Sequence, residues 1–85
     1  MKEFQYKIKD EIGIHARPAG LLVQEAKKFE SNILINCRDK KSSAKSLFGI
    51  MGMGIKNGDN ITVSVEGSDE STACLAIEKF FYDDL

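Results

Sequence analysis

Residues 13–20, GIHARPAG, hold the only histidine and the only proline of the chain, with an arginine two positions after the histidine. Neutral imidazole carries a nucleophilic ring nitrogen near pH 7. Because proline is tolerated only in the first turn of a helix, Pro18 predicts a helix that begins next to His15. The N–H groups of Ala16 and Arg17 would then lack intrahelical acceptors and could bind an anion. These residues predict a surface imidazole that accepts a phosphoryl group, whose oxygens contact the two amides and the Arg17 guanidinium.

The residues alone leave a second interpretation open, in which His15 is only a polar cap in a loop. Gly13 would allow the preceding loop to approach its neighbours closely, which either interpretation can accommodate. We identify no second histidine, cysteine or carboxylate that would pair with His15 in catalysis. A carrier therefore fits the motif better than a self-contained enzyme.

Length, charge and cysteine usage narrow the class of protein. A chain of 85 residues predicts one domain, residues 1–85. Its formal net charge of −1, from 12 basic and 13 acidic residues, argues against general nucleic-acid binding. No apolar run is long enough to span a bilayer and no signal peptide is visible, so we expect a cytoplasmic protein. Cys37 and Cys74 fall in apolar-periodic segments and are predicted to be small buried hydrophobes. No Cys/His cluster indicates a metal site, and no cofactor is expected.

The elements that must position the histidine follow from the hydrophobic pattern. Residues 2–9 alternate between apolar and polar side chains, which predicts a strand with one solvent-exposed face. The remaining predicted elements are a helix from Ala16 to about Glu30, strands at 32–37, 40–44 and 60–66, a short helix after Ser46, and a last helix capped by Ser68. This β-α-β-β-α-β-α order predicts an open-faced β-sandwich of the α+β class, with three helices packed on one face of a four-stranded antiparallel sheet.

A second segment, LFGIMGMG, follows Ser46 and predicts a short helix with that serine as its N-cap. We expect Ile50 to enter the core and the other large apolar side chains to form an exposed binding patch, namely Leu47, Phe48 and Met51. Met51 and Met53 are flexible and polarisable, which suits partners of different shapes. The alternative is that these side chains complete a small core.

The sequence resembles that of a known protein family. GIHARPAG is similar to the phosphorylation-site motif of HPr, the histidine-containing phosphocarrier of the phosphoenolpyruvate-dependent sugar phosphotransferase system. The similarity extends over essentially the whole chain, and KSLFGIMGMG at 45–54 resembles the regulatory serine segment of the family in Gram-positive bacteria. The resemblance implies that His15 is the phosphoacceptor and that Arg17 is its electrostatic partner. It also implies a monomer that is not itself an enzyme, takes the phosphoryl group from enzyme I and passes it to sugar-specific IIA domains.

The resemblance has further implications for the serine segment. Ser46 matches the serine that an HPr kinase/phosphorylase phosphorylates in Gram-positive relatives, and the phosphorylated form acts there as corepressor for the catabolite control protein. Ser42 and Ser43 are nearby, so the assignment rests on the position of Ser46 before the helix. The residues that would help to contact enzyme I and other partners are Leu47, Phe48 and Met51.

Two other functions compete with that of a carrier. A purely regulatory relative of the Crh type would keep the serine and lack the histidine, so His15 and Arg17 argue against it. An RNA-binding module of the split β-α-β type would need aromatic side chains on the outer face of the sheet. Phe4 and Tyr6 instead share the inward stripe with Ile8.

Gly20 departs from the family pattern. Inside a helix, it should lower the free energy of unfolding by about 0.5–1 kcal/mol relative to alanine.

Overall fold

The computed structural model describes residues 1–85 as four strands and three helices in β-α-β-β-α-β-α order. The predicted α+β class and the open four-stranded antiparallel sheet are confirmed. The strands are β1 (Lys2–Lys7), β2 (Asn32–Cys37), β3 (Lys40–Ser43) and β4 (Asn60–Glu66), and the helices are α1 (Ala16–Ala26), α2 (Leu47–Gly52) and α3 (Glu70–Asp84). The bounds of β2 and β4 agree with the prediction, whereas β1 and β3 end earlier than expected.

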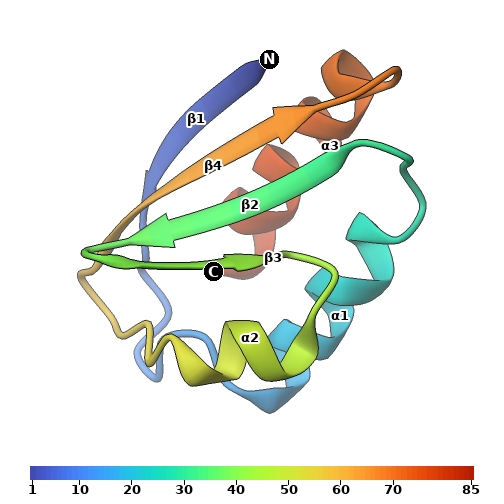
Figure 1. The fold of residues 1–85 in the computed structure, drawn as a ribbon. Helices are drawn as coiled ribbons and strands as arrows, with labels where there is room; N and C mark the ends of the chain where they lie inside the picture. The colour runs from blue at the N-terminus through green and yellow to red at the C-terminus, as the bar shows by residue number, and fades with distance from the viewer.

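The sheet has the strand order β1-β4-β2-β3, and every neighbouring pair is antiparallel (Figure 1). The register places Phe4 opposite Val63 and Val63 opposite Ile35, so one row of apolar side chains crosses three strands. All three side chains are buried. The alternation along each strand therefore separates a covered face from a solvent-exposed one.

Helices α1 and α3 cover the inner face of the sheet, while α2 packs against α1 and β3 at one end (Figure 1). The ring of Phe81 on α3 lies 6.0 Å from the ring of Phe4 and 5.7 Å from that of Tyr6, so both β1 aromatics face inward as predicted. Cys37 and Cys74 are free and buried, which confirms their prediction as small core residues. None of the helices has the length and apolarity needed to cross a membrane.

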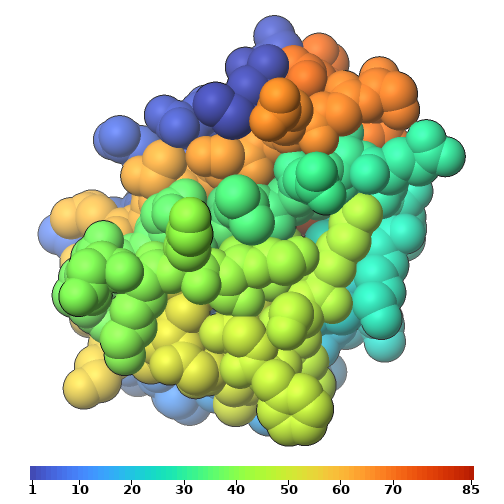
Figure 2. Space-filling view, in the orientation of Figure 1, coloured from blue at the N-terminus to red at the C-terminus, as the bar shows by residue number.

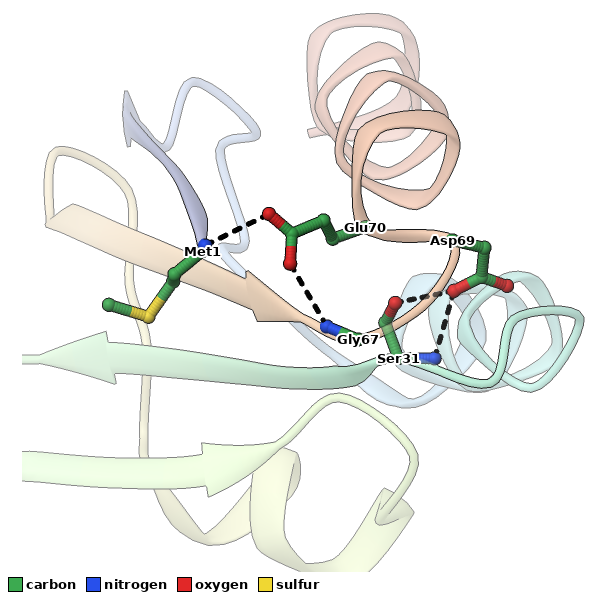
Figure 3. Close-up of polar contacts among 5 residues, drawn as sticks. All are labelled: Met1, Ser31, Gly67, Asp69 and Glu70. Atoms are coloured by element: carbon green, nitrogen blue, oxygen red, sulfur yellow. Dashed lines mark hydrogen bonds and ion pairs between the residues drawn. The ribbon is translucent and has the colours of Figure 1, made fainter.

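Helix α1 ends at Ala26, so its predicted extension to about Glu30 is wrong. The carboxylate of Asp69, which immediately precedes α3, accepts hydrogen bonds from the backbone N–H of Glu30 at 2.9 Å and from that of Ser31 at 3.0 Å. The Ser31 hydroxyl donates to the same carboxylate (Figure 3). These hydrogen bonds hold the segment between α1 and β2 against the start of α3.

The start of α3 also differs from the prediction by one residue, because Asp69 and not Ser68 occupies the N-cap position. Glu70 accepts a hydrogen bond from the Gly67 amide at 3.2 Å and forms an ion pair with the Met1 amino group at 2.9 Å (Figure 3). The Ser68 hydroxyl donates to the Glu30 carboxylate at 3.3 Å. The acidic residues at this helix end therefore join α3 to the α1–β2 loop and to β1.

Two glycines should respond to alanine in opposite directions. At Gly20 in α1 an added Cβ meets open space, so Gly20→Ala should raise the free energy of unfolding by about 0.5–1 kcal/mol. At Gly67, where φ is +156°, an added Cβ meets the backbone of Ser31, so Gly67→Ala should lower it by about 1–3 kcal/mol. Urea denaturation at neutral pH measures both changes. Shifts of the same sign would contradict the packing described here.

The Asp69 junction predicts an acid-sensitive contribution to stability. The Ser31 hydroxyl and the Glu30 amide hold the pKa of Asp69 below its ordinary value of 3.8. The stabilisation is thus fully present above about pH 4 and is lost as the pH falls through the lowered pKa. Asp69→Asn should lower the melting temperature at pH 7. The difference in melting temperature between the variant and the parent chain should disappear toward about pH 2. Asp39→Asn, at an exposed turn, is the control, and a gap that does not change with pH would contradict the role of the Asp69 charge.

Candidate functional site

His15 occupies the N-cap position of α1, with extended backbone angles of φ −119° and ψ −176°. Its side chain forms no capping hydrogen bond with the first turn and is partly exposed. The interpretation of His15 as a mere polar cap is therefore not supported. The imidazole sits at the mouth of the helix and its ring nitrogens are not used to close it.

The first turn of α1 presents two unused hydrogen-bond donors. No oxygen accepts a hydrogen bond from the N–H of Ala16 or Arg17, and Pro18 has no N–H to satisfy. The first helical hydrogen bond runs from the Ala19 amide to the His15 carbonyl at 2.9 Å. The partial positive charge of the helix end thus remains open to solvent beside the imidazole.

Arg17 adds a full positive charge to this helix end. Its side chain is exposed and belongs to none of the ion pairs of the protein. His15 and Arg17 line one open hollow of about 270 Å³, together with Asp10, Pro18, Leu21 and Asp84. The structure therefore brings His15 and Arg17 together. It also places two acidic residues at the hollow, Asp10 and Asp84, which the sequence prediction missed.

The loop before His15 is fixed by its own hydrogen bonds. The Asp10 carboxylate accepts from the Ile12 amide at 2.9 Å, and the Asp10 carbonyl accepts from the Gly13 amide at 3.0 Å. The Ile14 amide donates to the Ile55 carbonyl at 3.1 Å. Gly13 has a φ of +81°, and a Cβ there would collide with the Ile55 carbonyl oxygen, so only glycine allows this approach.

The connection between α2 and β4, which contacts this loop, is fixed by an ion pair and by hydrogen bonds. The Asp59 carboxylate accepts a hydrogen bond from the Lys56 amide at 2.8 Å and forms an ion pair with Arg38 at 2.7 Å. The Lys56 amide and the Arg38 guanidinium lower the pKa of Asp59. Asn57 donates from its side chain to the carbonyls of Lys9 and Asp10, each at 3.2 Å. The α2–β4 connection therefore acts as a support for the His15 loop.

Ser46 stands at the N-cap position of α2, as predicted, and its hydroxyl oxygen accepts a hydrogen bond from the Gly49 amide at 3.1 Å. Ser46 is exposed, whereas Ser42 and Ser43 are partly buried. The Ser42 hydroxyl donates to the Ser43 carbonyl, and the Ser43 hydroxyl oxygen accepts from the Lys45 amide, both at 3.1 Å. Of the three serines, Ser46 is thus the most accessible to a modifying enzyme.

The outer surface of α2 is apolar. Ile50 is buried, while Phe48 is 91% exposed and two neighbours are 42% and 43% exposed, namely Leu47 and Met51. Figure 2 shows the α2 segment, in yellow-green to yellow, forming the lower part of this face of the molecule. The alternative that these three side chains complete the core is wrong. The expectation that Met53 serves partners is also wrong, because Met53 is only 3% exposed and belongs to the core.

The hollow and the apolar surface lie on neighbouring elements. Helix α2 packs against α1, and the segment after α2 accepts the hydrogen bond from Ile14 just before His15. None of Ser46, Leu47, Phe48 or Met51 lines the hollow. The structure thus separates a small charged site from an apolar surface next to it.

Comparisons with known proteins agree in one family. The family model described as "PTS HPr component phosphorylation site" matches residues 2–83. The phosphocarrier protein HPr of Mycoplasma genitalium is 46% identical over 79 residues, which cover 92% of this chain and 90% of that protein. HPr of Mycoplasma capricolum subsp. capricolum is 42% identical over 83 residues, which cover 98% of this chain and 93% of that protein.

Solved structures give the same result. The structure of a histidine-containing phosphocarrier protein from Mycoplasma superposes with a TM-score of 0.94 at 41% identity. The superposition covers 96% of this chain and 93% of that one. The similarity therefore includes both the fold and the segment around His15.

Proposed function

The chain belongs to the HPr family of phosphocarrier proteins, and on this premise we propose that His15 accepts a phosphoryl group and later passes it on. Phospho-enzyme I is the donor and the IIA domains of sugar permeases are the acceptors, in the cytoplasm. The protein acts as a stoichiometric monomeric carrier and not as a self-contained catalyst. The single observation that carries this proposal is the imidazole of His15 at a helix end, free of capping, beside unused amides and a guanidinium.

The transfer is a displacement at phosphorus in both directions. The lone pair of the unprotonated imidazole nitrogen forms the bond to phosphorus as the donor bond breaks, and the donor keeps that electron pair. On delivery the phosphorus–nitrogen bond breaks, its electron pair returns to His15, and the acceptor forms the new bond. The amides of Ala16 and Arg17 and the guanidinium bind the phosphoryl oxygens.

The exposed apolar surface of α2 provides the docking site for enzyme I and the other partners, through Leu47, Phe48 and Met51. A patch of this kind on a small protein is typical of a binding surface. Its position next to the His15 loop lets one partner cover both the patch and the hollow.

Ser46 is the regulatory position of this surface, phosphorylated by an HPr kinase/phosphorylase and then recognised by the catabolite control protein. Its exposure and its place before Leu47 support this role. A phosphate there adds about 1.5–2 negative charges next to the apolar patch. The added charge weakens docking to an acidic enzyme I surface.

Incubation with enzyme I and phosphoenolpyruvate should add one acid-labile phosphate to the chain, measured by intact mass. His15→Ala should take up none. Arg17→Ala should be phosphorylated more slowly, by roughly tenfold or more, because one charged hydrogen-bond donor is lost. No uptake by the parent chain would contradict the carrier function, and an unchanged rate in Arg17→Ala would show that the guanidinium does not bind the phosphate.

Ser46→Asp should slow phosphotransfer from enzyme I while the circular dichroism spectrum stays native-like, because aspartate also caps helices well. Ser71→Asp, which adds the same charge at an exposed position on α3, should leave the rate unchanged. Equal rates in the parent chain and Ser46→Asp would remove the electrostatic account of regulation.

A further inference from the structure

The hollow around His15 is bordered by two acidic residues, although negative charge opposes the binding of phosphate. Asp10 and Asp84 border it together with Arg17. Neither carboxylate forms an ion pair, whereas other carboxylates of the protein do, namely Glu25, Asp59, Glu70 and Asp83. With a neutral imidazole, the ionised side chains of the hollow sum to one positive and two negative charges.

The fold holds Asp10 through its side chain and Asp84 through the backbone next to it. Asp10 is fixed in its turn by the bond from the Ile12 amide. Asp84 is the last residue of α3, and the next residue, Leu85, is buried. The main-chain oxygen of Leu85 accepts hydrogen bonds from the amides of Lys9 and Asp10 at 2.7 and 2.8 Å. The end of α3 is therefore tied to the loop that leads to His15.

We propose that Asp10 and Asp84 form an acidic rim that weakens the hold of the site on the phosphoryl group and keeps the group easy to pass on. The inference rests on the proposed carrier function. A phosphoryl group brings up to two negative charges into a solvent-filled hollow, where each carboxylate repels it. Arg17 and the two amides bind the group, and the rim opposes them. The balance between the two sets the free energy of transferring the phosphoryl group from His15 to the acceptor protein.

A competition at equilibrium tests the rim directly. A ¹⁵N-labelled parent chain and an unlabelled variant are mixed with a catalytic amount of enzyme I and less phosphoenolpyruvate than total chain. Enzyme I exchanges the phosphoryl group between the two His15 side chains, so one phosphorus–nitrogen bond breaks for each that forms. Intact mass spectrometry then gives the share of phosphate on each chain, and the label separates the two.

Asp84→Asn and Asp10→Asn should each hold the phosphoryl group about two- to fivefold more strongly than the parent chain at low salt. The double variant should exceed either one. Asn retains the acceptor oxygen that Asp10 offers to Ile12, so the loop is preserved. In about 1 M salt the preference should approach unity, which an effect of altered packing would not do.

Asp83→Asn is the matched control, because it removes the same charge one position away, from a carboxylate that pairs with Lys79 and does not line the hollow. It should share the phosphate equally with the parent chain. Equal sharing by Asp84→Asn and Asp10→Asn would overturn the rim, and so would a preference of Asp83→Asn as large as theirs. Failure of the parent chain to take up any phosphate would overturn the carrier function and the rim with it.

Discussion

The hydrogen bond from the Ile14 amide to the Ile55 carbonyl, 3.1 Å long, is the contact on which the site depends. It draws the chain against the α2–β4 connection two residues before α1 begins, and Gly13 makes the approach possible. His15 therefore enters the helix from an extended conformation, with its imidazole outside the first turn. Had the chain entered with the side chain folded over the helix end, the imidazole would cap the amides that the proposed phosphate site uses.

The size of the protein explains why the site is a shallow surface hollow. A core of 22 buried residues fills the space between the sheet and the helices. A chain of this length buries a smaller fraction of its surface than a longer chain does, about 60–65%, and an enclosed cavity would remove contacts that it needs. Binding must therefore come from donors at the surface, where water screens each charge. A site of this kind would bind phosphoryl oxygens only modestly, which fits the proposed role as a carrier that has to release the group.

The sequence predicts those features that depend on local pattern. The bounds of β2 and β4 follow from alternation, the start of α1 from Pro18, and the exposure of Phe48 from the shortness of α2. What it could not predict depends on distant partners. Asp69 binds the amides of Glu30 and Ser31 in the segment that follows α1. Asp84 reaches the hollow because Leu85 bonds to the loop before His15. Asp10 lies only five positions before His15, and this short separation in sequence is the one signal that could have predicted its place at the site.

The two helix ends that the sequence singles out differ in a way that matches their proposed roles. At α1 the N-cap side chain makes no bond to the helix and two amides remain free, so a group on His15 finds donors without displacing any. At α2 the Ser46 oxygen already accepts from Gly49, and the apolar surface begins at the next residue. A charge placed there is therefore set beside side chains that must lose water when a partner docks. These different local geometries fit the proposed phosphoryl transfer at α1 and the proposed control of docking at α2.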